Sequence, residues 1–288
     1  MNQLPTLVAV IGPVEPHLLS AFIDHYRALG IGRFLIGFHF PSTADPDLRA
    51  ELLTLARNLL GTPPAFVNEG PWHGGLTNAA LRDKLRSQAG GGWHLLADID
   101  ELQSYTTSLS EEIDRAERSG SPVVGGVMLD RVTADGKFRS WTSEIGLDRS
   151  YPLGGFLTHE LLRGDPRKIV LVRSGVRVDI GNHRSPDHRP INRPRIVIHH
   201  FKWRGDVIPY LAERAEKLGT GQWREESPAL WEETLRLLSH VDAHGGGLDV
   251  SGDTVLFRPV TLGTTPSWWA PESGRIVDTW RPHARRPS

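Results

Sequence analysis

The first hundred residues alternate short apolar runs with amphipathic segments, and this alternation limits the fold more than any other feature of the sequence. Residues 7–11, 34–40 and 65–67 are apolar runs bounded by turn residues, which predicts buried strands. Between them, residues 16–29 and 46–60 place leucine and aromatic side chains at helical spacing, which predicts two helices. Alternating strands and helices are typical of an α/β fold with a doubly wound, largely parallel sheet.

A third predicted helix, residues 78–87, leads into the sequence Trp-His-Leu-Leu-Ala-Asp-Ile-Asp-Glu-Leu at residues 93–102. Residues 95–97 are expected to form a buried strand, so that Asp98 and Asp100 lie at its carboxyl end, where open α/β sheets bind ligands. Together with Glu101 they place three carboxylates within four residues. Such carboxylates repel one another unless a positive charge lies between them, and a divalent cation carrying a phosphorylated substrate would supply it. The alternative is an acidic turn with solvated carboxylates.

The second half of the chain is less regular. A helix is expected at 109–118, strands at 123–129, 168–172 and 195–199, and helices at 209–218 and 228–240. A tail rich in tryptophan and proline follows. We therefore expect a mixed sheet flanked by helices in a catalytic domain of residues 1–210, with residues 211–288 as a C-terminal helical appendage packed on it.

The composition of the chain argues against several classes of partner and site. The formal net charge of −1 gives no electrostatic footprint for nucleic acid or an anionic membrane, so neither is an expected partner. The absence of cysteine excludes disulfides, thiolate metal sites and a cysteine nucleophile. No signal peptide and no apolar run of ~20 residues is recognisable, which predicts a cytoplasmic protein without an integral membrane segment. Neither a Gly-x-Gly-x-x-Gly nor a Walker motif occurs, which argues against dinucleotide and P-loop sites.

Several stretches resemble the GT-A-fold glycosyltransferases, and more narrowly a family-2-like group whose motif reads Asp-x-Asp-Glu-Phe. The motif here is Asp98-Ile99-Asp100-Glu101, with Leu102 in place of the phenylalanine. Residues 22–36, 124–138, 180–185 and 199–206 resemble the first helix, the strand after the motif and the late histidine-containing segments of that group. The resemblance covers roughly residues 5–218 and implies a GT-A-like, Rossmann-type sheet.

The resemblance also implies an activity, namely transfer of a sugar from a nucleoside-diphosphate sugar to an acceptor that the sequence does not identify. We expect a UDP-sugar rather than a GDP-sugar as donor, and Mn²⁺ or Mg²⁺ as the metal that neutralises the leaving diphosphate. Asp100 is the first choice for direct ligation, and Asp98 would bind the ribose or the metal. Glu101 is expected to accept hydrogen bonds behind them.

Further donor-side residues follow from the same resemblance. His200 would complete the metal ligands and Lys202 would hold diphosphate oxygens, while His199 is expected on the opposite face of the strand. His183 is a rival ligand or a contact to the donor. The group usually carries Asn-Glu after the first strand; this sequence has Gly-Pro-Val-Glu there, and Glu15 is expected to take over the nucleotide contact.

The acceptor side is less constrained. Asp130 and Arg131 end the strand after the acidic motif, which places them near the acceptor, and Arg131 is expected to contact this substrate. An inverting reaction needs a carboxylate base, for which Asp130, Glu144 and Glu160 are candidates. A retaining reaction would need no such base, and Asp130 paired with a neighbouring arginine would be purely structural. Trp72 is a candidate platform on which the C–H face of a sugar would stack.

Two other functions remain open from the sequence. Metal-dependent nucleotidyltransferases and phosphohydrolases also use paired carboxylates at strand ends, although the Gly-rich signature loop of the sugar nucleotidyltransferases is missing. A non-catalytic nucleotide-binding relative would retain the fold without the activity.

Overall fold

The computed structural model describes residues 4–71, 74–189, 191–223 and 229–279. The chain forms two units, of which the first is Met1–Gly126 with Lys168–Ile196 and the second is Val127–Arg167 with Val197–Ser288. The chain passes between them within strand β6 (Val123–Val132), at the start of β8 (Arg167–Arg173) and within β9 (Ile191–His200). These bounds do not follow the expected division at residue 210, which stays a prediction about domain organisation.

The sheet of the first unit has the strand order β8–β4–β1–β2–β3. Its other members are β1 (Thr6–Ile11), β2 (Phe34–Phe40), β3 (Phe66–Glu69) and β4 (Trp93–Leu96). β1 pairs in parallel with β2 and β4, β2 pairs in parallel with β3, and β8 runs antiparallel to β4. The chain thus runs outward from β1 to β3 and returns to the other side of β1 as β4. The carboxyl ends of β1 and β4 form the topological switch point at which open α/β sheets bind ligands.

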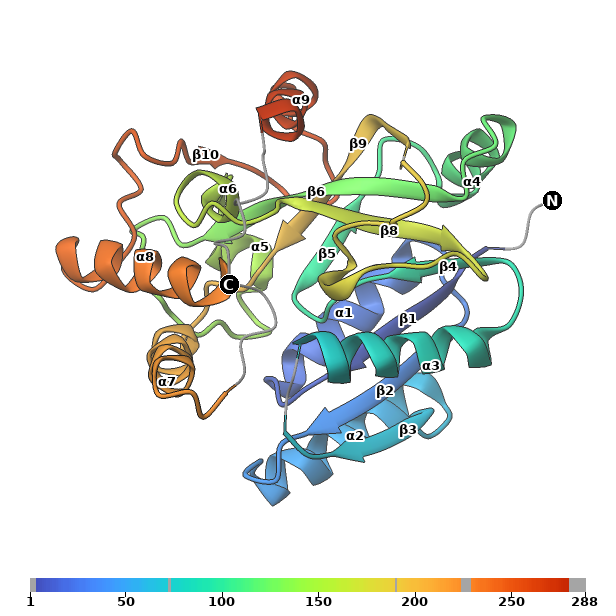
Figure 1. Ribbon diagram of the computed structural model, residues 1–288, viewed down its shortest axis with the longest axis horizontal. Helices are drawn as coiled ribbons and strands as arrows, with labels where there is room; N and C mark the ends of the chain where they lie inside the picture. The colour runs from blue at the N-terminus through green and yellow to red at the C-terminus, as the bar shows by residue number, and fades with distance from the viewer. Residues whose placement is uncertain (1–3, 72–73, 190, 224–228, 280–288) are drawn as a thin grey trace. The chain divides into compact units, whose positions relative to one another are not determined.

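Helices cover both faces of this sheet. They are α1 (Pro16–Ala28), α2 (Pro46–Leu60), α3 (Ala80–Ala89), preceded by a π-helical turn at Gly74–Ala79, and α4 (Leu109–Arg118). α1 and α2 contact each other, while α3 packs against β1 and β2 on the opposite face (Figure 1). Leu85 and Ala89 of α3 belong to one apolar cluster with Val8, Val10 and Leu96 from the sheet, so burial of the helix's apolar stripe fixes α3 beside the switch point.

The second unit contains an antiparallel set of strands, in which β7 (Leu153–Gly155) lies between β6 and β10 (Arg258–Pro259). Its helices are α5 (Leu147–Ser150), α6 (Leu157–Glu160), α7 (Val207–Gly219), α8 (Ala229–Ala243) and α9 (Trp269–Thr279). Trp203, Leu211 of α7 and Leu237 of α8 share one buried cluster. Trp269 and Ile276 of α9 pack with apolar β6 residues in another, so the late helices stabilise the strands that carry Asp130.

The expectation of a mixed α/β sheet flanked by helices is confirmed. Several short elements were missed, namely α5, β7, α6 and β10. Two more were missed at places that bear on the expected site and tail: β5 (Glu101–Ser104), which follows the acidic turn, and α9, which lies where only a Trp/Pro-rich tail was expected. Local pattern gave little signal for either, because β5 has four residues and α9 carries Pro271 in its first turn. In the part of the chain that the structure describes, no helix combines the length and apolarity needed to cross a membrane.

Candidate functional site

The acidic motif forms a tight turn at the carboxyl end of β4. The backbone N–H of Glu101 donates to the Asp98 carbonyl at 2.9 Å, and the backbone N–H of Asp98 donates to Glu101 Oε2 at 3.2 Å. Tyr26 of α1 donates its hydroxyl to the Glu101 carbonyl at 2.8 Å. Asp98 and Asp100 are half-buried, whereas Glu101 is buried. The turn therefore leaves the two aspartates partly accessible and buries the glutamate, whose predicted role as a hydrogen-bond acceptor in the functional site stays a prediction.

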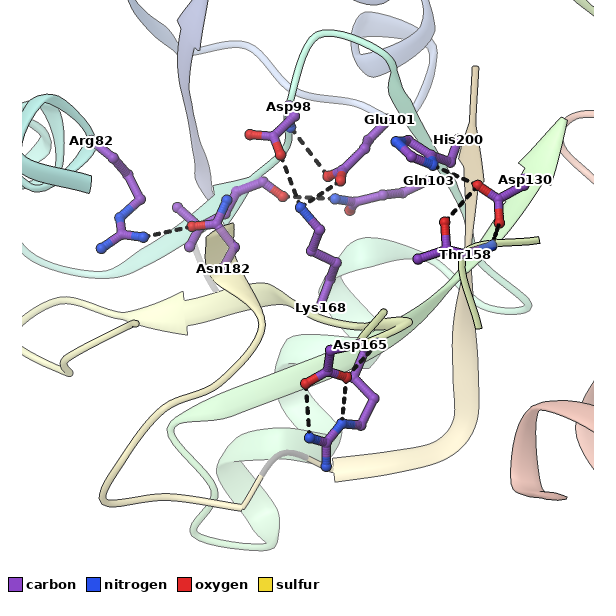
Figure 2. A network of polar contacts seen from close by, with 12 residues as sticks. Arg82, Asp98, Glu101, Gln103, Asp130, Thr158, Asp165, Lys168, Asn182 and His200 are labelled. Atoms are coloured by element: carbon purple, nitrogen blue, oxygen red, sulfur yellow. Dashed lines mark hydrogen bonds and ion pairs between the residues drawn. The ribbon is translucent and has the colours of Figure 1, made fainter. Parts of the chain in front are cut away.

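Lys168 supplies positive charge to this turn. Its Nζ lies 2.8 Å from Asp98 Oδ2 and 2.6 Å from Glu101 Oε1, as Figure 2 shows. Burial by itself would lower the pKa of the lysine, but the two carboxylates hold that pKa above its ordinary value. Part of the repulsion within the acidic motif is thus relieved by a side chain of the protein itself.

Sequence reasoning missed Lys168. It stands directly before the apolar residues 169–172 in the predicted strand 168–172, and it is 6% exposed. A lysine in such a strand has to find a carboxylate, because an unpaired buried charge is strongly unfavourable. This requirement could have identified Lys168 from the sequence as one member of an ion pair, although it does not say which acid in the chain is the partner.

A small pocket adjoins the turn within the first unit. It is lined by Val8, Ala9, Val10, Asn78, Ala79, Arg82, Ala97, Asp98, Gly181 and Asn182. Arg82 of α3 is buried and donates to the Val178 carbonyl at 2.8 Å and to Asn182 Oδ1 at 2.8 Å, as Figure 2 shows for Asn182. Arg82 therefore does not lie on a solvated helix face, and its guanidinium holds the segment before His183 against α3.

Other donor-side candidates also belong to the first unit. His183 directly follows the 3₁₀ turn Ile180–Asn182 and is half-buried. Glu15 is the N-cap residue of α1, directly after the loop that leaves β1, and its side chain makes no capping hydrogen bond. Both residues thus flank the elements that form the pocket. Trp72 lies outside the described residues, so its expected stacking role stays a prediction.

Asp130 of β6 lies in the second unit and is fully buried. Its Oδ1 accepts from His200 Nδ1 at 2.8 Å and from the Thr158 hydroxyl at 2.9 Å, and its Oδ2 accepts from the Thr158 N–H at 2.6 Å (Figure 2). Oδ1 also accepts from Trp203 Nε1 at 2.9 Å. Burial alone would raise the pKa of Asp130, but His200, Thr158 and Trp203 hold it below its ordinary value. A carboxylate with four donors favours a role in positioning His200 over proton abstraction from an acceptor.

Arg131 is also fully buried in the second unit. Its guanidinium pairs with Asp148 at 2.7 Å, donates to the Tyr151 carbonyl at 2.6 Å and lies 2.9 Å from His199 Nδ1. Asp148 rather than Asp130 is thus the carboxylate of its ion pair. These contacts favour a structural role for Arg131, whose predicted substrate contact remains untested.

The remaining candidates of the second unit differ in exposure. Glu144 is exposed in the loop before α5. Glu160 of α6 pairs with Arg275 of α9 at 2.9 Å. Lys202 is half-buried, and its Nζ lies 5.2 Å from the centre of the Trp203 ring. Of the two histidines that end β9, His199 faces Arg131 and His200 faces Asp130, which agrees with their expected placement on opposite faces.

The residues do not form a ready metal site. Within the described residues, no group of three or more His, Asp or Glu side chains is arranged to hold a metal ion. Asp98 and Asp100 belong to the first unit and His200 to the second. Asp98 is paired with Lys168, and His200 Nδ1 is bonded to Asp130. The described residues thus form no complete set of ligands for the expected metal.

Comparison with known proteins gives distant similarities only. No protein-family model and no curated protein matches the sequence. Among solved structures, S. aureus TarS in complex with UDP-GlcNAc is similar at 13% identity and TM-score 0.37, over 83% of this chain and 74% of that one. The mannosyltransferase PcManGT from Pyrobaculum calidifontis, in complex with GDP-Man and Mn²⁺, is similar at 12% identity and TM-score 0.39, over 97% and 82%. A UDP-glucose pyrophosphorylase complexed with UDP-glucose is similar at 9% identity and TM-score 0.28, over 82% and 99%.

Proposed function

We propose that this protein is a glycosyltransferase that takes a sugar from a nucleoside-diphosphate sugar. The observation that carries the proposal is the acidic turn of Asp98 and Asp100 at the β1/β4 switch point, next to a pocket with polar side chains from α3 and the segment before His183. Ligands of open α/β sheets bind at this place, and half-buried carboxylates there are suited to accept hydrogen bonds from sugar hydroxyls.

The donor side of the reaction follows from this placement. Asp98, already paired with Lys168, would accept hydrogen bonds from the ribose of the nucleotide, and Glu15 and Asn78 would line the approach to the base. The glycosidic bond breaks through an oxocarbenium-like transition state, and the nucleoside diphosphate leaves. We propose that the ammonium group of Lys202 stabilises the negative charge on the departing diphosphate.

On the acceptor side, an inverting reaction requires a carboxylate that takes the proton of the attacking hydroxyl. Of the three candidates, Asp130 is fully buried and Glu160 is half-buried, whereas Glu144 is exposed. We therefore retain Glu144 as the proposed base. A Glu144→Gln variant should lose transfer activity while its affinity for the donor nucleotide stays unchanged.

The first test is nucleotide binding, measured by thermal stabilisation and calorimetry with UDP, GDP and their sugars, each with Mn²⁺ and with EDTA. We expect stabilisation by a nucleoside diphosphate, with UDP preferred, and its loss in Asp98→Asn and Asp100→Asn. Asp24→Asn, on the exposed side of α1, is the matched control and should bind like the wild type. Absence of binding by every nucleotide in both conditions would refute the proposal.

A second test separates transfer from the alternative enzyme class. Incubation with a nucleotide sugar that binds should release the nucleoside diphosphate as the sugar is transferred slowly to water, which stands in for the acceptor. A sugar nucleotidyltransferase would instead release pyrophosphate from a nucleoside triphosphate and a sugar phosphate. Pyrophosphate release by the wild type, lost in Asp98→Asn, would replace the glycosyltransferase proposal with that activity. Binding without turnover of any donor would instead support a non-catalytic relative.

A further inference from the structure

Two carboxylates of the acidic turn converge on one ammonium group, and this geometry extends the proposed function. Lys168 is 6% exposed and Glu101 is 2% exposed, whereas a third of the Asp98 side chain remains accessible. All three belong to the first unit, with Lys168 on β8 and the acids on the turn that follows the neighbouring strand β4. The lysine is thus held by strand pairing rather than by a mobile surface chain.

The ammonium occupies the place that a cation would take. Nζ lies within 2.8 Å of one oxygen from each carboxylate, so both acids direct an oxygen at the same point (Figure 2). Divalent cations bind carboxylate oxygens at about 2.0–2.6 Å, so a metal between these two acids would overlap the lysine. Moving Lys168 aside would also leave its charge in a buried position without a partner, which is strongly unfavourable.

We propose that Lys168 is a built-in counter-ion that excludes divalent metal from the space between Asp98 and Glu101 and so keeps Asp98 as a hydrogen-bond acceptor for the nucleotide. The part that concerns the nucleotide rests on the proposed function, whereas the exclusion of metal does not. In this arrangement Asp98 does not ligate a metal directly, because its Oδ2 already faces the ammonium of Lys168. Lys168 is therefore a positioning residue, because it acts through Asp98.

The first experiment uses Mn²⁺ alone as the probe, with the free ion measured by electron paramagnetic resonance during titration of the full chain. Lys168→Met removes the ammonium and leaves two carboxylate oxygens aimed at one point, so Mn²⁺ affinity should rise at least about tenfold over the wild type. Lys168→Arg keeps the charge and should stay near the wild type. Lys84→Met removes an exposed lysine of α3 and should change nothing.

The double variant Lys168→Met/Glu101→Gln supplies the decisive comparison. It removes one of the two acids together with the lysine, so the gain in Mn²⁺ affinity should disappear. Equal Mn²⁺ affinity of the wild type and Lys168→Met would overturn the proposal, and so would a gain that persists in the double variant. A structural role of Lys168 alone would lower stability without moving Mn²⁺ affinity in this pattern.

Lys168→Met places two carboxylates close together, and the variant will fold poorly if nothing neutralises them. Refolding this variant with and without millimolar Mn²⁺ then tests whether the metal binds between the two carboxylates. Recovery of the folded state that depends on metal supports the proposal. The proposal is overturned if Lys168→Met fails to refold both with and without Mn²⁺ while the double variant folds. Mn²⁺ would then be unable to take the place of the lysine ammonium between the two carboxylates.

Nucleotide binding forms a separate arm. In EDTA, Lys168→Met should bind a nucleoside diphosphate at least about tenfold more weakly than the wild type, because Asp98 and Glu101 then repel the diphosphate. Unchanged affinity in EDTA would overturn the positioning part of the proposal. If the wild type binds no nucleotide at all, the proposed function fails, whereas the Mn²⁺ titration still decides whether Lys168 excludes metal.

Discussion

The hydrogen-bonded carboxylate of Asp130 offers the sharpest stability prediction. We expect Asp130→Asn to destabilise the second unit, because the carboxylate is fully buried and accepts from four donors, three of them on side chains. Asparagine has the same shape but turns an N–H₂ group toward at least one of these donors. The substitution therefore tests hydrogen bonding and charge without leaving a cavity.

The magnitude follows from the contacts. Hydrogen bonds to a charged group contribute about 1.5–3 kcal/mol each, but they are not additive within one network. Removing one partner of a buried charged pair costs about 3–5 kcal/mol. Since the asparagine oxygen still accepts from some of the donors, we expect a loss near the lower limit, about 3 kcal/mol.

Urea unfolding followed by tryptophan fluorescence and circular dichroism measures this loss. The matched control is Asp135→Asn, an exposed acid in the same unit, which should change the free energy of unfolding by less than about 0.5 kcal/mol. A double-mutant cycle with Trp203→Phe should give a coupling energy of about 1 kcal/mol, because the two residues share a hydrogen bond. A cost of Asp130→Asn equal to that of the control would refute the reasoning.

The same carboxylate sets a pH dependence. The pKa of Asp130 is lower in the folded protein than its ordinary value of about 3.9. A carboxylate of this kind stabilises the fold above its unfolded pKa, and the contribution is lost as the pH falls toward the folded value. The stability difference between the wild type and Asp130→Asn should therefore shrink as the pH falls below about 4. A difference that grows on acidification would contradict this sign.

Two further predictions concern the backbone. Gly136 has φ +71°, and a Cβ there would lie 2.1 Å from the carbonyl oxygen of Leu248. Gly136→Ala should therefore lower the free energy of unfolding by more than about 2 kcal/mol in thermal unfolding. Gly120 has φ +68° but open space around it, so Gly120→Ala should lower it by about 1 kcal/mol. Equal costs would mean that the chain near Leu248 moves aside. Ser108 caps α4 in a capping box, so Ser108→Ala should cost about 1 kcal/mol in urea unfolding; no loss would mean that water replaces the cap.

Much of the fold followed from local sequence pattern. The apolar runs at β1, β2 and β4, and the 3.6-residue spacing in α1 and α2, identify elements whose buried face is decided within a few residues. The short elements did not follow, because four residues of β5 carry too little pattern. The strand order placed Asp98 and Asp100 at a carboxyl end, so the expected location of the candidate site needed no tertiary information beyond the handedness of the crossovers.

The roles of individual side chains at the site were decided by tertiary contacts. The sequence alone determined that three crowded carboxylates need positive charge, since Asp98, Asp100 and Glu101 are neighbours in the chain. It left open which cation answers that need. Lys168 stands 70 residues beyond Asp98 in the sequence and reaches it only because β8 pairs beside β4. Whether a carboxylate is paired, buried or accessible to a ligand depends on which distant strand lies next to it. The neighbouring strand is determined by the packing of the whole sheet rather than by local sequence pattern.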